Sequence, residues 1–288
     1  MSNAPSIAEK IRANRDVMTR SEAQLVEVIL DEYPVSGLCS ITELAEKAAV
    51  SSPTVGRLLQ KLGYGGYGEF QAALRVELSE MISNPISKRV QWKSDLPEEH
   101  ILSRYAALAL DNQRSTLDGL DPAEFDVLLG LLADPRRRVF LAGGRITGVL
   151  AQYFYLHLQM IRPEVRILPM AGSWPHHLLD LRDGDVFVAF DVRRYENTTM
   201  MMAQMCHERG AEVALFTDQW RSPIRKVARL TFAGRISVPS AWDSMGSLML
   251  LIECTIAALQ ELLWDSVQER TNALESAFDR TRLFRKFG

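Results

Sequence analysis

The sequence has few cysteines and no cluster of metal ligands. Its three cysteines, Cys39, Cys206 and Cys254, are scattered over 288 residues without a Cys-x-x-Cys pair, which argues against a disulfide framework and against a zinc site. His176 and His177 are adjacent, a spacing that does not place two ligands on one helical face. We therefore expect reduced thiols, no bound metal and no other cofactor.

Long apolar runs are missing as well. No stretch of 18 or more apolar residues occurs, and residues 9–16 are largely charged where a signal peptide would have its apolar core. This pattern predicts a soluble cytoplasmic protein with no membrane partner. With 288 residues, of which 47% are hydrophobic, the chain is long enough to form two domains with separate cores.

Residues 40–68 carry two short helical patterns separated by a tight turn. Ser40 and Glu43 form a capping-box pattern, and apolar residues follow at helical spacing. Ser51 or Ser52 can cap the second helix, which is expected over residues 54–61. The stretch therefore predicts a helix-turn-helix.

The second of these helices has polar and basic side chains opposite its apolar positions. Such groups near the N-terminus of an exposed helix are suited to reading the major groove of DNA. The residues expected to contact DNA are Ser51, Ser52, Thr54, Arg57, Gln60 and Lys61.

Positive charge is scarce around this pattern. Residues 1–80 hold eight Lys and Arg against eleven Asp and Glu, a net charge of −3. Phosphate binding needs local positive potential, and residues 51–68 contain Arg57 and Lys61 with no acidic residue. A dimer would double the DNA contacts of this weakly cationic segment.

Other helical patterns surround the helix-turn-helix. Helices are expected over residues 6–17, after a cap at Thr19 or Ser21, and over 70–78. Tyr64, Tyr67 and Phe70 favour core packing over base stacking. A polar linker is expected over 81–96, and further helices over 98–117 and 121–133.

Beyond residue 135 strands alternate with helices. Strands are expected at 138–142, 165–169, 185–190, 212–217 and 227–233, helices at 147–160 and 198–209, and one long final helix at 242–264. Alternation of this kind predicts a parallel sheet covered on both faces. The fold class is therefore a two-domain α/β protein, with an all-α head and a five-stranded parallel, flavodoxin-like domain. The expected domains are 1–80, a linker and connecting helix at 81–120, and 121–288.

Ligands of parallel sheets bind beyond the carboxyl ends of the strands. The loops at those ends are residues 143–148, 191–198 and 218–223. Glycine allows close backbone approach to an anion, and arginine supplies forked donors for it. The candidate ligand-binding residues are Gly143, Gly144, Arg145, Thr147, Asp191, Arg193, Arg194 and Thr198. The alternative is that the glycines only permit a tight turn while the arginines are solvated or pair with Asp191 and Glu196.

These motifs resemble a known family. The segment LAEKAAVSSPTVGRLLQKLGYGGYGEF, preceded by MTRSEAQLVEVIL, is similar to the RpiR/MurR family of bacterial transcription regulators over residues 5–80. The order of strands and helices, with TDQWRSPI after the fourth strand, resembles a sugar isomerase (SIS) domain over about residues 125–265. The resemblance implies a regulator that binds operator DNA as a homodimer or homotetramer and senses a phosphorylated sugar or related metabolite.

The chain departs from the family at the second ligand loop. The usual motif there is Ser-x-Ser-Gly-x-Thr, whereas residues 191–196 read Asp-Val-Arg-Arg-Tyr-Glu. Two hypotheses follow: a ligand with an anionic group met by Arg193 or Arg194, or a domain that has lost its ligand and only dimerises.

SIS domains also form aldose-ketose isomerases, which need a base that moves a proton between adjacent carbons. Glu253 and His207 are the available groups, but Glu253 lies within the apolar pattern LMLLIECTIAAL and no acid–base pair stands out. We therefore predict no catalytic residues and no enzymatic activity, with isomerase as the alternative.

Overall fold

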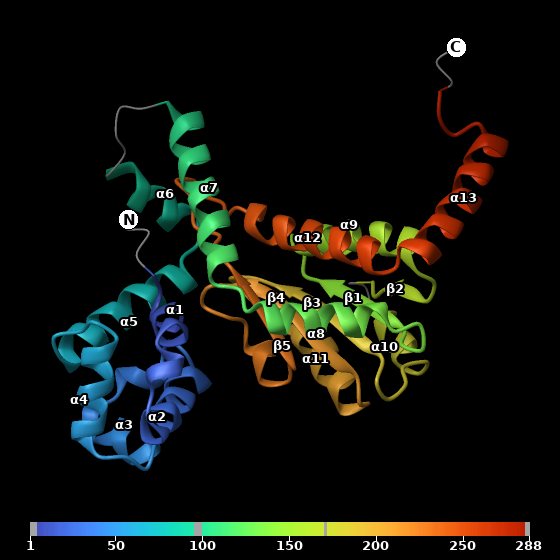
Figure 1. Cartoon of the computed structure of the whole chain (residues 1–288). Helices are drawn as coiled ribbons and strands as arrows, with labels where there is room; N and C mark the ends of the chain where they lie inside the picture. Colours follow the sequence, from blue (N-terminus) through green and yellow to red (C-terminus); the bar gives the residue numbers. More distant parts are fainter. Residues whose placement is uncertain (1–4, 95–99, 170–171, 286–288) are drawn as a thin grey trace. The chain divides into compact units, whose positions relative to one another are not determined.

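Side-chain caps begin the helices at the N-terminal end of the chain. The computed structural model describes residues 5–94, 100–169 and 172–285 (Figure 1). Ser6 with Glu9, Thr19 with Glu22, and Ser40 with Glu43 each form a complete capping box, in which both partners satisfy a free backbone N–H. The caps expected at Thr19 and Ser40 are thereby confirmed.

The first unit consists of residues up to Gly119 together with Asp218–Lys226 and Ala233–Met245. Its helices are α1 Ile7–Ala13, α2 Arg20–Asp31, α3 Ile41–Lys47, α4 Ser52–Lys61, α5 Tyr67–Ile82, α6 Pro85–Ser94 and α7 Ile101–Asp118, with short 3-10 turns at Arg15–Val17, Ser36–Leu38 and Pro223–Lys226. We call α1 to α5 the head.

Apolar side chains of α2, α3, α4 and α5 meet in the core of the head. Fully buried members include Leu25, Ile29, Leu44, Leu58 and Phe70. The expectation for the aromatics is confirmed, because Tyr64 is buried and meets the Phe70 ring edge-on at 5.6 Å. Tyr67 is half-buried and its hydroxyl donates to the carbonyls of Gly37 and Cys39.

The expected linker over residues 81–96 contains a helix that the sequence analysis did not predict, α6 at Pro85–Ser94. The Asn84 side chain accepts hydrogen bonds from the backbone N–H groups of Ile86 and Ser87, both at 2.9 Å. Asn-Pro is therefore an N-cap followed by a proline in the first turn of a helix rather than a turn signal.

The second unit consists of Leu120–Thr217, Val227–Phe232 and the residues from Gly246 onward. Its sheet has the strand order β2-β1-β3-β4-β5. The strands are β1 Val139–Gly143, β2 Val165–Ile167, β3 Val186–Asp191, β4 Glu212–Asp218 and β5 Leu230–Gly234. Strand β1 pairs in parallel with β2 and with β3, and β3 pairs in parallel with β4.

Helices cover both faces of this sheet, as expected for buried apolar strands. In Figure 1, α9 and α12 lie together on one face and α11 lies on the opposite face. The helices are α8 Pro122–Ala133, α9 Gly148–Ile161, α10 Trp174–Leu178, α11 Asn197–Glu208, α12 Gly246–Leu262 and α13 Trp264–Thr281. The predicted fold class is confirmed.

The final helix differs from the prediction of one helix over 242–264. Helix α12 begins at Gly246 and ends at Leu262, and α13 continues to Thr281 after a bend of 100°. Val267, Leu274 and Phe278 recur at helical spacing among charged residues, a sparse apolar stripe that the prediction missed. Within the described ranges no single helix is long and apolar enough to span a membrane, although the bent α12–α13 pair passes that test by length and composition.

A buried carboxylate joins α5 to the other side of the head. Glu77 accepts hydrogen bonds from the Tyr33 hydroxyl and, at 2.8 Å, from the backbone N–H of Ile7. Burial raises the pKa of Glu77 from 4.5 to about 7, an effect that the two hydrogen bonds oppose. Burial and the neighbouring Glu77 together raise the pKa of the Tyr33 hydroxyl well above 10.

The Glu77 pKa makes the stability of the head depend on pH. The folded protein keeps a proton that the unfolded chain loses between pH 4.5 and about 7, so the free energy of unfolding falls as pH rises through this window. We expect Glu77→Gln to remove up to about 3 kcal/mol of this loss. Urea denaturation at pH 4.5, 6 and 7.5 measures the difference, with Glu46→Gln at an exposed site as the control. Parallel profiles for wild type and Glu77→Gln would contradict this prediction.

Candidate DNA-binding face and effector site

The helix-turn-helix is formed by α3 and α4. Ala49, between them, has a left-handed backbone with φ of 49°, and the Val50 N–H donates to the carbonyl of Ala45 at 2.9 Å. This turn lets α4 begin within a few residues of the end of α3. Ser51, and not Ser52, is the N-cap, since its hydroxyl accepts from the Thr54 N–H at 3.4 Å.

The exposed side of α4 is narrower than predicted. Arg57 and Gln60 are exposed and Ser52 is half-exposed, but Thr54 is only 7% exposed. The Thr54 hydroxyl lies 2.9 Å from the Ser51 hydroxyl and accepts a hydrogen bond from Arg57 Nη2 at 3.1 Å. The expectation that Thr54 is available on the outer surface was therefore wrong, and its position suits it to orienting Arg57.

The ammonium of Lys61 is bound by other residues of the head. It lies 2.6 Å from Glu22 Oε2 and donates to the carbonyl of Val17 at 3.1 Å. Glu22 is only 3% exposed. Burial raises its pKa, but the hydrogen bonds from Lys61 and Thr19 outweigh burial and hold the pKa below its usual value. Much of the Lys61 charge thus compensates a buried carboxylate, which leaves Arg57 as the more available cation of α4.

At the carboxyl edge of the sheet, the loop after β1 lies close to the end of β3. The Thr147 hydroxyl accepts from the Gly144 N–H and donates to the carbonyl of Phe190, both at 2.7 Å. A Cβ on Gly143 would lie 2.6 Å from the backbone of Thr147, so this position requires glycine. Thr147 is 4% exposed, and its hydroxyl is used in joining the two strands.

The loop after β3 places the remaining predicted residues in different environments. Asp191 is buried at the end of β3 and its Oδ1 accepts from the Glu196 N–H at 3.3 Å. Arg193 is 8% exposed and already engaged by neighbouring groups. Arg194 is exposed, with a left-handed φ of 65°. Thr198, in the first turn of α11, is half-buried.

Two guanidinium groups remain available at this edge. The side chains of Arg145 and Arg194 are exposed, and neither forms a hydrogen bond or an ion pair with the residues that the structure describes. They come from the loops after β1 and β3, and the Thr147 hydroxyl ties the first of these loops to Phe190 near the end of β3. Of the three arginines predicted to bind an anion, Arg145 and Arg194 are therefore exposed and Arg193 is buried.

Glu196 contacts the loop after β1, and the sequence did not predict this contact. Its Oε1 accepts a hydrogen bond from the backbone N–H of Arg145 at 2.7 Å. A Cβ added to Gly144 would lie 2.6 Å from the same oxygen. The sequence left open that Glu196 pairs with an arginine side chain. Its carboxylate instead accepts a hydrogen bond from the backbone N–H of Arg145. The signal in the sequence was an acid where the family motif has its threonine.

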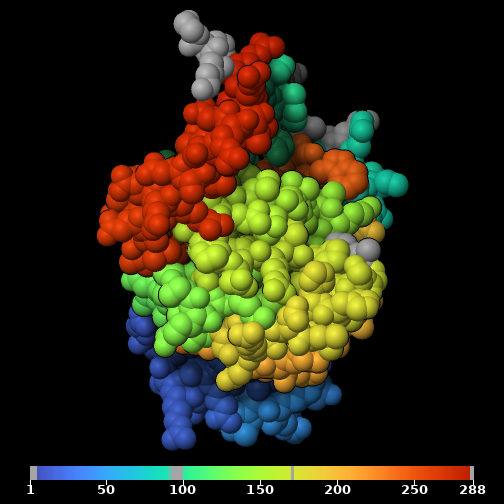
Figure 2. Space-filling view, turned by 90° about the vertical axis from the view of Figure 1, so that its right-hand side faces the viewer, coloured from blue at the N-terminus to red at the C-terminus, as the bar shows by residue number. Residues whose placement is uncertain are grey.

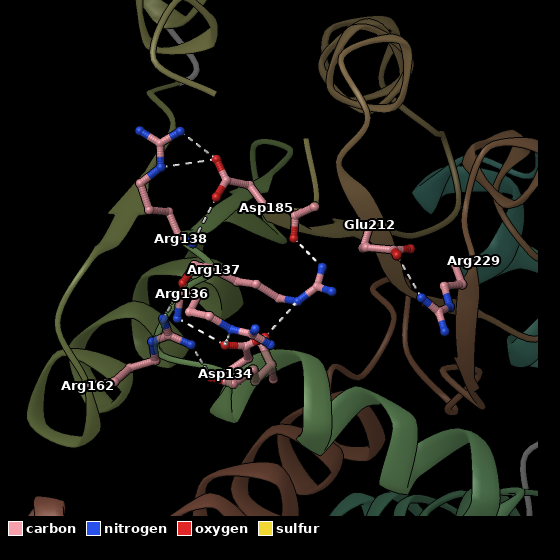
Figure 3. Close-up of polar contacts among 10 residues, drawn as sticks. Asp134, Arg136, Arg137, Arg138, Arg162, Asp185, Glu212 and Arg229 are labelled. Atoms are coloured by element: carbon pink, nitrogen blue, oxygen red, sulfur yellow. Dashed lines mark hydrogen bonds and ion pairs between the residues drawn. The ribbon is translucent and has the colours of Figure 1, made fainter. Parts of the chain in front are cut away.

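The amino ends of the strands are closed by arginines (Figure 3). Arg138 binds Asp185 through Nε and Nη2, with a shortest N–O distance of 2.6 Å, and both side chains are nearly buried. Arg162 donates to the carbonyls of Leu132 and Arg137. Burial raises the pKa of Asp185, and the hydrogen bonds and charge of Arg138 reverse this to a net decrease. These arginines are used in contacts within the domain.

Comparison with known proteins agrees with this geometry. A family model described as the helix-turn-helix domain of the rpiR family matches residues 6–81, and a SIS domain model matches residues 131–258. The chain is an RpiR-type transcriptional regulator. No group of three His, Cys, Asp or Glu side chains that could hold a metal occurs in the part of this regulator that the structure describes.

Relatives of this RpiR-type regulator cover most of its length. It is 27% identical over 236 residues to the HTH-type transcriptional regulator HexR of Pseudomonas aeruginosa. The aligned region covers 78% of this chain and 77% of HexR. It is 21% identical over 234 residues to RpiR of Escherichia coli K12, covering 78% and 75%.

Solved structures share the fold. The sugar isomerase domain of an RpiR transcription factor from Sphaerobacter thermophilus has a TM-score of 0.58 at 16% identity, covering 62% of this chain and 99% of that one. Vibrio vulnificus NanR, solved in complex with ManNAc-6P, has a TM-score of 0.52 at 18% identity, covering 94% and 99%. At these identities the likeness extends to the fold alone.

The hydrogen bonds of the Thr147 hydroxyl at the carboxyl edge of the sheet predict how substitutions there change the free energy of unfolding. Thr147→Val keeps the shape but removes the buried hydrogen bonds to the Gly144 N–H and the Phe190 carbonyl. We expect a loss of about 2–4 kcal/mol in the free energy of unfolding. Thr147→Ser, which keeps the hydroxyl, should lose about 1 kcal/mol or less. Guanidinium denaturation followed by circular dichroism compares them, and equal losses for the two variants would refute the hydrogen-bonding role.

Proposed function

We propose that this regulator binds operator DNA through the exposed side of α4 and senses a small anionic metabolite at the carboxyl edge of its SIS domain. The observation that carries the DNA part is the Ser51–Thr54–Arg57 arrangement. The capped start of α4 holds Arg57 through Thr54 Oγ1 at 3.1 Å, with no acidic residue in the helix. The proposed DNA-contacting groups are Ser51, Ser52, Arg57 and Gln60, with Thr54 and Lys61 supporting them.

The effector part rests on two available guanidinium groups. Arg145 and Arg194 come from loops at the ends of neighbouring strands, where ligands of parallel sheets bind. Guanidinium groups suit carboxylate and phosphate because they donate two parallel hydrogen bonds. NanR, which shares this fold, was solved with the phosphosugar ManNAc-6P, and this supports a small anionic effector here. Binding of effector would favour one arrangement of the two heads and so change operator affinity.

The same proposal places the protein in the cytoplasm, where the chromosome is, and assigns it no enzymatic activity. The isomerase alternative needs an acid–base pair. Glu253 is exposed on α12 and accepts a hydrogen bond from the Tyr153 hydroxyl at 3.2 Å, while His207 is exposed in the last turn of α11. An isomerisation assay with ribose and glucosamine phosphates would overturn this assignment if turnover appeared.

We further propose a homo-oligomer held by α9, either a homodimer or a homotetramer. Val149, Leu156 and Met160 share one face of α9 and are exposed, Leu156 by 53%. Figure 2 shows the yellow-green surface that includes α9 open beside α13 in red. A second copy of this chain is the proposed occupant, because a head with net charge −3 gains DNA affinity when two heads act together.

The DNA proposal predicts unequal roles for the two cations of α4. Selection of duplexes from a random library by the purified full chain supplies a binding site. On the selected duplex, Arg57→Ala should weaken binding by about 1–3 kcal/mol if it reads a guanine. Lys61→Ala should lose less, since its ammonium already binds Glu22.

Fluorescence anisotropy with the selected and a scrambled duplex makes this measurement. Arg75→Ala, which removes an exposed cation from α5, is the matched control. A loss confined to the selected duplex assigns Arg57 to a base, and an equal loss on both duplexes assigns it to phosphate. Identical affinities for Arg57→Ala and Arg75→Ala would rule out α4 as the DNA-binding helix.

The oligomer proposal is tested by a charge on α9. Leu156→Glu places a carboxylate in the proposed interface, where it would be buried without a partner, and should raise the dissociation constant at least about tenfold. Leu179→Glu, at an exposed leucine outside α9, should leave the mass unchanged. Light scattering after gel filtration reports both. A wild-type monomer, or an unchanged Leu156→Glu oligomer, would count against the interface.

A further inference from the structure

We propose that the Glu196 carboxylate is an internal ligand of the loop after β1 and determines which effector the SIS domain accepts. While Glu196 lies against Gly144, a phosphate group cannot enter that loop, and the anionic group of an effector is directed to Arg145 and Arg194. This inference rests on the proposed function, in which the SIS domain binds a small anionic molecule.

The space beside Gly144 is filled by the carboxylate itself. Oε1 and Cδ of Glu196 lie 2.6 and 2.7 Å from where a Cβ on Gly144 would stand. Oε1 also takes the hydrogen bond of the Arg145 N–H at 2.7 Å. Glycine here admits a close neighbour, and that neighbour is an anion from the protein's own chain.

The backbone of Glu196 is anchored at the start of α11. Glu196 is the N-cap of α11, and its N–H donates to Asp191 Oδ1 at 3.3 Å. Its own side chain makes no capping bond to α11. The carboxylate is instead committed to the neighbouring loop, which the Thr147 hydroxyl ties to the end of β3.

The charge at this point opposes a second anion. In the family motif the position of Glu196 is a threonine, a short hydroxyl that can donate to a phosphate. A carboxylate accepts hydrogen bonds only and repels a phosphate placed within a few ångströms. The exposed guanidinium groups of Arg145 and Arg194 lie outside this occupied space as alternative donors.

The variant Glu196→Thr, which returns one position of the family motif, tests the proposal. Threonine is a favoured N-cap residue, so the variant should fold. Inorganic phosphate and glucose 6-phosphate are the probes, titrated by calorimetry into the full chain. We expect Glu196→Thr to bind them at least tenfold more tightly than wild type. Glu196→Gln, which removes the charge but keeps an acceptor for the Arg145 N–H, should gain less than Glu196→Thr.

Glu208→Thr makes the same chemical change at the exposed far end of α11 and should bind the probes as wild type does. Circular dichroism and the melting temperature establish that each variant is folded. A folded Glu196→Thr with no gain, or a wild type that binds the probes equally well, overturns the proposal.

The proposed function fails separately. If wild type selects no DNA sequence, or no anionic metabolite shifts its melting temperature, the regulator model or its sensing part fails, while a gain of phosphate binding in Glu196→Thr still supports the role of Glu196.

Discussion

The carboxyl edge of the sheet depends on the two hydrogen bonds of the Thr147 hydroxyl. By accepting from Gly144 and donating to Phe190 it fixes the loop after β1 against the end of β3. The loop's approach requires glycine at 143, and its position brings the Arg145 N–H to the Glu196 carboxylate. A buried hydroxyl that satisfies two backbone groups is costly to replace.

In the head, ion pairs between specific residues compensate the excess of acidic side chains. Such pairs are Lys61 with the buried Glu22 and Arg235 with Glu9, whose closest N–O distance is 2.8 Å. Arg235 follows β5 directly, so a residue next to the end of a strand contacts α1 of the head within the first unit. Arg57, held by Thr54, then carries much of the positive potential of α4. The proposed dimer would add the contacts of a second head to this limited positive charge.

Local signals in the sequence predicted most of the fold. Ser40 with Glu43 identified one helix start and Thr19, as one of two candidate caps, another. Apolar runs such as 185–190 identified strands, because capping and burial act over a few residues. Asn84-Pro85 was misread because a turn and a helix start share that dipeptide. Helix α13 was missed since its apolar stripe is sparse and its burial depends on α9, which is distant in sequence.

The candidate site was harder to predict than the fold. Thr54 and Arg193 were expected to be available, but packing decides burial and packing is a property of the whole domain. Glu196 reaches Gly144 across 52 residues of sequence, a contact that no local pattern encodes. Only the departure from the family motif marked the position as unusual.

The central claim is that an anion bound at Arg145 and Arg194 changes the affinity of the heads for DNA. Its most direct test is the anisotropy of a selected duplex with the full chain, titrated with a panel of phosphorylated and carboxylated metabolites. The account predicts that at least one metabolite shifts the DNA affinity of wild type, and that Arg194→Ala abolishes the shift while its affinity without metabolite is unchanged. A wild type that no metabolite affects, or an Arg194→Ala variant that responds like wild type, would contradict it.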